Sequence, residues 1–109
     1  MSAEVIALIS DSKNEVLFSV LSLWEIAIKS ALGREDFATD AKRLRGVLLA
    51  DGFLELPIAA EHCFAVAELP PLHRDPFDRL LIAQAIVEGV TLLTADAKVA
   101  AYPGPILAV

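Results

Sequence analysis

The chain contains 109 residues, which is enough for one small domain and not for two. Hydrophobic residues make up 56% and charged residues 22%, a balance that excludes an intrinsically disordered chain. Nine basic and 15 acidic residues give a net charge of −6, which argues against a protein that grips nucleic acid by neutralising phosphates over a broad face. An enzyme that acts on nucleic acid stays compatible with this charge, because bound divalent metal ions can supply positive charge locally.

Membrane and disulfide-rich classes are also disfavoured. No stretch approaches the ~18 uninterrupted apolar residues of a membrane span, and the segment from Met1 to Glu4 lacks the basic and apolar parts of a signal peptide. One cysteine, Cys63, excludes an internal disulfide, and we expect it to be a small buried residue. A cytoplasmic protein is therefore predicted.

The first half of the chain is predicted to contain a helix end, a buried strand, two helices and a second strand, at residues 4–10, 15–18, 20–32 (or 23–32), 40–50 and 53–56. Ser19 or Ser22 is predicted to cap the helix that follows the first strand, and Gly33 to stop it. The next helix is amphipathic, and Leu44, Val47 and Leu48 are predicted on its inner face.

The second half contains a helix, a proline-rich loop, a second helix and two strands, at residues 59–68, 69–74, 75–88, 90–94 and 106–109. The second of these helices has strong boundary signals, because Asp75 can cap it, Pro76 suits its first position and Gly89 follows its end. Strands that alternate with helices predict a parallel sheet covered by helices, which is the α/β class.

Three acidic residues follow strands at the places where open parallel sheets bind ligands: Glu25, Asp78 and Asp96. Carboxylates that gather at one edge repel each other unless a hard cation lies among them. Such oxygen ligands suit Mg²⁺ or Mn²⁺. A site of this kind can activate water for in-line attack on a phosphodiester and stabilise the leaving oxygen.

Each acid also has a purely structural interpretation. Ser22 and Glu25 fit a capping box, and Asp75 with Asp78 at the third helical position allows the same interpretation. Asp96 fits a turn, or the cap of a short helix that follows it. Spacing alone leaves these alternatives open.

Three runs of sequence carry a resemblance to a known family: SLWEIAIK at 22–29, HRDPFDRLLIAQA at 73–85 and LLTAD at 92–96. In this order they closely resemble the PIN-domain family, and in particular the VapC-type toxins of bacterial toxin–antitoxin pairs. The run HRDPFDR is the most specific of the three. The similarity extends over residues 1–109 and implies a single domain with a PIN-like three-layer α/β/α fold and a parallel sheet.

The resemblance implies a Mg²⁺- or Mn²⁺-dependent endoribonuclease that cuts RNA, forms homodimers and is neutralised by a cognate VapB-like antitoxin. Carried over by motif, Glu25, Asp78 and Asp96 are the catalytic acids that hold the metal. Ser19, Thr94 and Asp75 would support the site, Asp75 mainly as a helix cap. Arg79 would contact an RNA phosphate or pair with a nearby carboxylate.

One expected feature of the family has no match in this sequence. The family begins with a strand that ends in an aspartate. The aspartate is one of the chief metal ligands, and the strand lies in the middle of the sheet. Asp11 cannot replace it, because it falls in a turn before a different strand. We therefore expect an N-terminally incomplete domain. Three explanations stay open: the true start lies upstream, the chain is a degenerate or fragmentary copy, or another chain fills the gap. The alternative function is a catalytically inactive PIN-domain remnant that only binds partner proteins.

Overall fold

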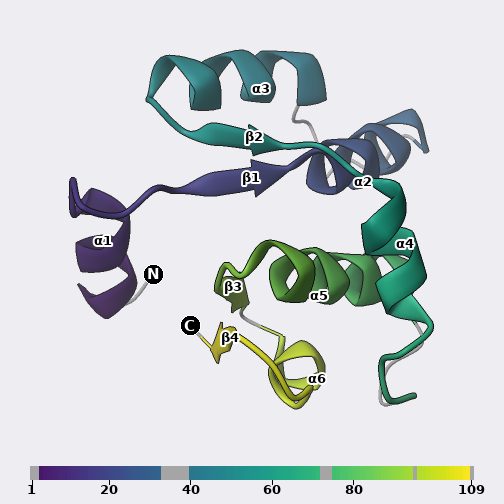
Figure 1. Cartoon of the computed structure of the whole chain (residues 1–109). Helices are drawn as coiled ribbons and strands as arrows, with labels where there is room; N and C mark the ends of the chain where they lie inside the picture. The colour runs from purple at the N-terminus through teal and green to yellow at the C-terminus, as the bar shows by residue number, and fades with distance from the viewer. Residues whose placement is uncertain (1–2, 33–39, 72–74, 95, 109) are drawn as a thin grey trace. The chain divides into compact units, whose positions relative to one another are not determined.

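The computed structural model describes residues 3–32, 40–71, 75–94 and 96–108. The chain divides into two compact units, Ala7–Pro57 and Met1–Ile6 with Ile58–Val109, and each is described by itself. The described elements, labelled in Figure 1, are α1 (Ala3–Ser10), β1 (Leu17–Ser19), α2 (Val20–Ala31), α3 (Ala41–Ala50), β2 (Leu54–Leu56), α4 (Ala60–Val66), α5 (Pro76–Glu88), β3 (Leu92–Thr94), α6 (Ala97–Ala100) and β4 (Ile106–Ala108).

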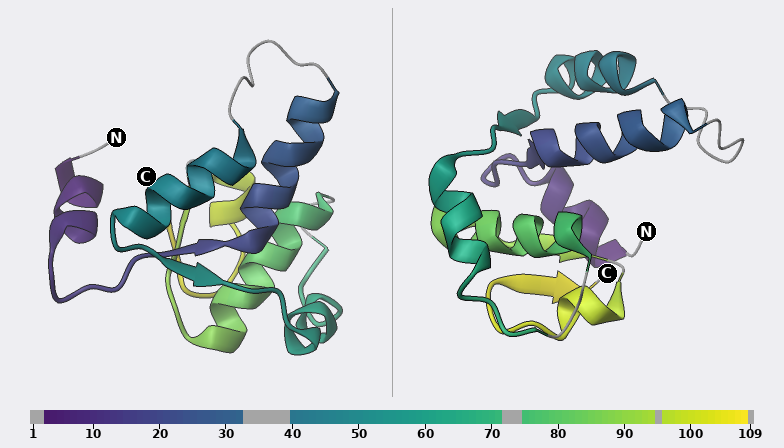
Figure 2. Two further views of the ribbon diagram at one scale, coloured as in Figure 1. Left: turned by 90° about the horizontal axis from the view of Figure 1, so that it is seen from above. Right: turned by 90° about the vertical axis from the view of Figure 1, so that its right-hand side faces the viewer.

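The unit Ala7–Pro57 is built around one pair of parallel strands. β1 and β2 pair in register from Leu17 opposite Leu54 to Ser19 opposite Leu56. Parallel strands need a long crossover connection, and here α2 and α3 lie between them in the chain. The two helices pack side by side (Figure 2). Leu21, in the first turn of α2, is 1% exposed and anchors this helix.

Polar side chains begin both helices of this unit. Ser19 caps α2, since its hydroxyl accepts a hydrogen bond from the backbone N–H of Leu21 at 3.1 Å. The capping box proposed for Ser22 is therefore wrong, because Ser22 already lies inside the helix. Asp40 caps α3 in the same way. Val47, predicted to face the interior, is 50% exposed.

The unit that contains Ile58–Val109 has a second pair of parallel strands. β3 and β4 pair from Leu92 opposite Ile106 to Thr94 opposite Ala108, and α6 lies between them in the chain. The core beside these strands consists of Ile82 from α5, Val99 from α6 and Tyr102.

Helix α4 packs against α5 in the same unit (Figure 1). The contact centres on His62, which is 1% exposed. The backbone N–H of Ala59 donates to His62 Nδ1 at 2.9 Å, so the ring proton lies on Nε2, which is 3.1 Å from Glu88 Oε1. Cys63, the next residue, is exposed, and the expectation of a buried cysteine is therefore wrong.

Helix α5 has the boundaries that the sequence predicts. Asp75 is its N-cap, Pro76 occupies its first position, and Gly89 ends it with a φ of 67°, which a residue with a side chain rarely adopts. The α/β class with parallel strands is confirmed by the two strand pairs. Among the described residues no helix is long and apolar enough to cross a membrane.

We expect His62→Ala to destabilise the chain by about 2–4 kcal/mol, because it removes a buried side chain and leaves the Ala59 N–H without its acceptor. Urea unfolding measures the difference. The matched control is Cys63→Ala on the exposed face of α4, which should stay within about 0.5 kcal/mol of the unmodified chain. Equal stability of the two variants would contradict the structural role of His62.

The ion pair between Arg45 of α3 and Glu55 of β2 should make stability depend on pH. The hydrogen bonds and charge of Arg45 lower the pKa of Glu55, and those of Glu55 raise the pKa of Arg45. A carboxyl whose pKa is lowered on folding contributes stability above its unfolded pKa, and this is lost as the pH falls through the folded pKa.

Arg45→Gln should therefore lower the melting temperature near neutral pH, and its difference from the unmodified chain should shrink as the pH falls from about 7 to 3. Arg43→Gln, on the same helix, is the control for loss of one positive charge. A deficit of Arg45→Gln that does not change with pH would contradict the assignment.

Candidate functional site

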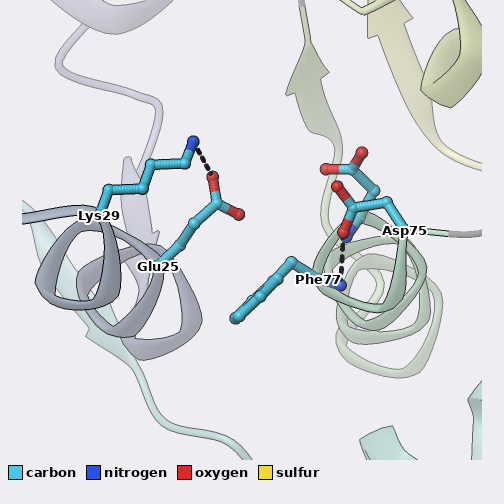
Figure 3. A network of polar contacts seen from close by, with 5 residues as sticks. Glu25, Lys29, Asp75 and Phe77 are labelled. Carbon is cyan, nitrogen blue, oxygen red and sulfur yellow. Dashed lines mark hydrogen bonds and ion pairs between the residues drawn. The ribbon is translucent and has the colours of Figure 1, made fainter. Parts of the chain in front are cut away.

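Two of the predicted acids lie at the start of α5. Asp75 Oδ1 accepts hydrogen bonds from the backbone N–H groups of Phe77 at 2.9 Å, shown in Figure 3, and of Asp78 at 3.4 Å. The predicted capping role of Asp75 is thus confirmed. Asp78 occupies the third helical position and is half-buried. The cap therefore fixes the backbone of Asp78 directly.

Asp96, the third of the acids in this unit that the sequence singled out, follows β3. The backbone N–H of Asp96 donates to Thr94 Oγ1 at 3.0 Å, so the strand-end hydroxyl orders the turn that carries the acid. Asp96 Oδ1 accepts from the Lys98 N–H at 2.8 Å, which makes Asp96 the N-cap of α6. The interpretation of Asp96 as a helix cap is thus confirmed, while support of a catalytic site by Thr94 stays a prediction.

Glu25 and Ser19 belong to the unit Ala7–Pro57. Glu25 lies in α2, where its Oε1 is 3.0 Å from the ammonium of Lys29, one helical turn later (Figure 3). The two side chains are 32% and 34% exposed. An i,i+4 pair of this exposure contributes only about 0.3–0.5 kcal/mol, so Lys29 is a weak competitor for a cation at this carboxylate. Ser19 is buried, and its hydroxyl caps α2.

Arg79, the residue after Asp78, makes its described hydrogen bonds within the chain. Nη1 donates to the carbonyl of Pro70 at 3.0 Å and to the hydroxyl of Tyr102 at 3.1 Å, and Nη2 donates to the carbonyl of Val66 at 3.1 Å. Contact with RNA phosphate and pairing with a nearby carboxylate, the two expectations for this residue, stay predictions. Sequence reasoning missed Tyr102 as a partner, because nothing in the pattern joins positions so far apart.

The structure brings Asp75 close to Asp78 and Thr94 close to Asp96, all within one unit. In neither unit do three or more described His, Cys, Asp or Glu side chains gather so that they could hold a metal ion. His73, Arg74 and Ala95, which complete the motifs, lie outside the described residues.

The donor chemistry of these acids fits a hard divalent cation. Asp75 and Asp96 make their described hydrogen bonds through Oδ1, and Oδ2 takes part in none of them. Each carboxylate can therefore cap a helix with one oxygen and offer the other to a cation. Oxygen ligands from a few carboxylates, completed by water, are what Mg²⁺ and Mn²⁺ prefer.

The chain is an α/β protein, because its parallel strands are joined by helices. One aspartate follows a strand end and others lie at the start of α5, and their oxygens are donors suited to a divalent cation. The family model of the PIN domain matches residues 2–105, and the chain therefore belongs to the PIN domain family. PIN domains are generally nucleases that act on RNA or other nucleic acids, and typically use divalent metal ions. A search of curated proteins found no match.

Substitutions at Asp75 should separate helix capping from chemistry. Asp75→Ala removes the acceptor for two backbone N–H groups and should lower the free energy of unfolding by about 1 kcal/mol. Asp75→Asn keeps an equally good cap without the charge, so its stability should equal that of the unmodified chain. If Asp75 is only a cap, RNA cleavage by the asparagine variant is also unchanged, and a loss of cleavage without a loss of stability would contradict this.

Proposed function

We propose that this chain is a Mg²⁺- or Mn²⁺-dependent endoribonuclease that hydrolyses phosphodiester bonds of RNA, similar to the VapC-type toxins. The PIN domain match over residues 2–105 carries the proposal, because it assigns the nuclease class to nearly the whole chain. The run HRDPFDR, which gave the resemblance to these toxins, supports the finer assignment.

We assign the catalytic and metal-binding acids as Glu25, Asp78 and Asp96. The assignment of three acids to one site rests on the family motifs. For Asp78 and Asp96 the described hydrogen bonds add support, since Asp75 orders the backbone of the first and Thr94 that of the second. A bound Mg²⁺ or Mn²⁺ ion supplies activation of water and stabilisation of the leaving oxygen.

The residues of the chain then have separate tasks in this proposal. The three carboxylates bind the cation and balance its charge, and the backbone around them is held by Asp75, Thr94 and Ser19. For Arg79 the proposal favours support over contact with RNA, because an RNA phosphate would have to share or replace its bonds to Val66, Pro70 and Tyr102.

The resemblance to toxins extends the proposal to partners. We assign the chain a cognate VapB-like antitoxin, a homodimeric assembly and a cytoplasmic location, and we treat residues 1–109 as a single PIN-like domain. Within this proposal the antitoxin keeps the nuclease from cellular RNA until it is removed.

Cleavage of a labelled single-stranded RNA by the purified chain tests the activity, with Mn²⁺, with Mg²⁺ or with EDTA. We expect cleavage with either metal and none with EDTA. Asp78→Asn keeps the shape of the side chain and removes its charge, and it should lower the rate at least about 100-fold, because loss of a ligand exceeds the effect of losing an outer-shell contact.

The matched control is Asp51→Asn, an exposed aspartate at the end of α3, which should cleave like the unmodified chain. Identical preparation of both variants excludes a contaminating ribonuclease as the source of cleavage. Metal-independent cleavage, or equal cleavage by Asp78→Asn, would overturn the proposal. No cleavage by a folded chain would favour the alternative, a PIN domain that only binds partner proteins.

A further inference from the structure

The guanidinium of Arg79 joins three segments of its unit to the first turn of α5. Its bonds reach the carbonyl of Val66, the last residue of α4, the carbonyl of Pro70 in the loop that follows, and the hydroxyl of Tyr102 beyond α6. The carbonyl of Val66 also accepts from the backbone N–H of Leu69 at 3.1 Å, so Arg79 adds a second hydrogen bond to a carbonyl at the end of α4. The planar fork of arginine suits several acceptors at once.

Tyr102 connects this set of bonds to α6. Its side chain is 3% exposed and packs with Ile82 and Val99. Its backbone N–H donates to the carbonyl of Val99 at 3.1 Å, so the tyrosine is fixed to the helix by its main chain as well. The hydroxyl that accepts from Arg79 therefore has a defined position relative to α6.

The Arg79–Tyr102 hydrogen bond links the first turn of α5, which carries Asp78, to the segment that follows α6, the helix that Asp96 caps. Arg79 directly follows Asp78, and Tyr102 lies two residues after the end of α6, beyond its C-cap Ala101. α6 has only four residues, so a shift of Tyr102 is passed on to Asp96 over a short distance. The bond thus ties the segment of one carboxylate to that of the other.

We infer that Arg79 and Tyr102 are positioning residues, which hold Asp78 and Asp96 at the separation that one divalent cation requires. The inference rests on the proposed function, because it takes these two carboxylates as ligands. Contacts behind the ligands of a metal site fix ligand orientation, and their loss typically weakens metal binding 10–100-fold.

Tyr102→Phe gives the sharpest test, because it removes one hydroxyl, keeps the buried ring and leaves every charge unchanged. Substitution of Arg79 by a neutral residue would also remove a cation near the site, and this alone changes the attraction for metal. Titration calorimetry of the metal-free full chain with Mn²⁺ should give a Kd about tenfold higher for Tyr102→Phe than for the unmodified chain. Arg79→Lys, which keeps the charge without the fork, should raise the Kd to a similar extent.

The matched control is Ile82→Val, which trims a neighbour of Tyr102 in the same core and leaves both hydrogen-bonding groups in place. Ile82→Val and Tyr102→Phe should each lower the melting temperature by about 2–8 °C. Only Tyr102→Phe should change the Kd for Mn²⁺. A purely stabilising role would leave the Kd of both variants unchanged.

The outcomes separate this inference from the proposed function. Mn²⁺ binding that Asp78→Asn abolishes and Tyr102→Phe leaves intact would overturn the positioning role alone. Equal weakening by Ile82→Val and Tyr102→Phe would also overturn it, since a change in packing of the shared core, and not the lost hydrogen bond, would then account for the effect. Absence of Mn²⁺ binding by the folded, unmodified chain would overturn the proposed metal site and this inference with it.

Discussion

The first turn of α5 is the constraint on which the described part of the candidate site depends. A helix start leaves four backbone N–H groups without helical partners, and Pro76 removes one of them by having none. Asp75 accepts from the next two, at Phe77 and Asp78. Arg79 then ties this turn to the end of α4 and to Tyr102. Asp78 lies between the helix cap Asp75 and the hydrogen-bonded Arg79, so its backbone has little conformational freedom.

Structural and chemical roles are compatible at these aspartates. A carboxylate has two oxygens, and in both Asp75 and Asp96 the described bonds to backbone N–H groups use the same one, Oδ1. The second oxygen of each carboxylate takes part in none of these bonds and suits ligation of a divalent cation. The confirmed caps therefore do not count against the proposed metal site.

Residues near the helix ends predicted the helix boundaries correctly where capping interactions between neighbouring residues determine them. The bounds of α5 follow from Asp75, Pro76 and Gly89, each of which acts within one turn of the helix end. Position in the tertiary structure was harder to predict. Val47 and Cys63 have apolar side chains that sequence patterning assigns to the interior, yet both are exposed. Whether such a residue finds a neighbour to pack against is decided by other segments of the chain.

In the candidate site too, contacts between residues close in sequence could be predicted, and contacts between distant residues could not. The pair of Glu25 and Lys29 is visible in the sequence as an i,i+4 spacing, and the caps at Asp75 and Asp96 are visible as aspartates before helical segments. The bonds from Arg79 to Val66, Pro70 and Tyr102 have no such signal, because they join positions that only the fold brings together. Sequence motifs can therefore nominate the acids of a PIN domain, while the contacts that position them have to come from the structure.

The charge of the chain bears on how it would bind RNA. With a net charge of −6, the chain as a whole repels a polyanion. Within the part of the chain that the structure describes, several basic side chains are engaged, since Lys29 pairs with Glu25, Arg45 pairs with Glu55, and Arg79 binds two carbonyls and a hydroxyl. We therefore expect neutralisation of phosphates by basic side chains to contribute little to RNA affinity. In the proposed function a divalent cation at the acids would offset both their mutual repulsion and the repulsion of the substrate, which is the physical reason to expect strict dependence on metal.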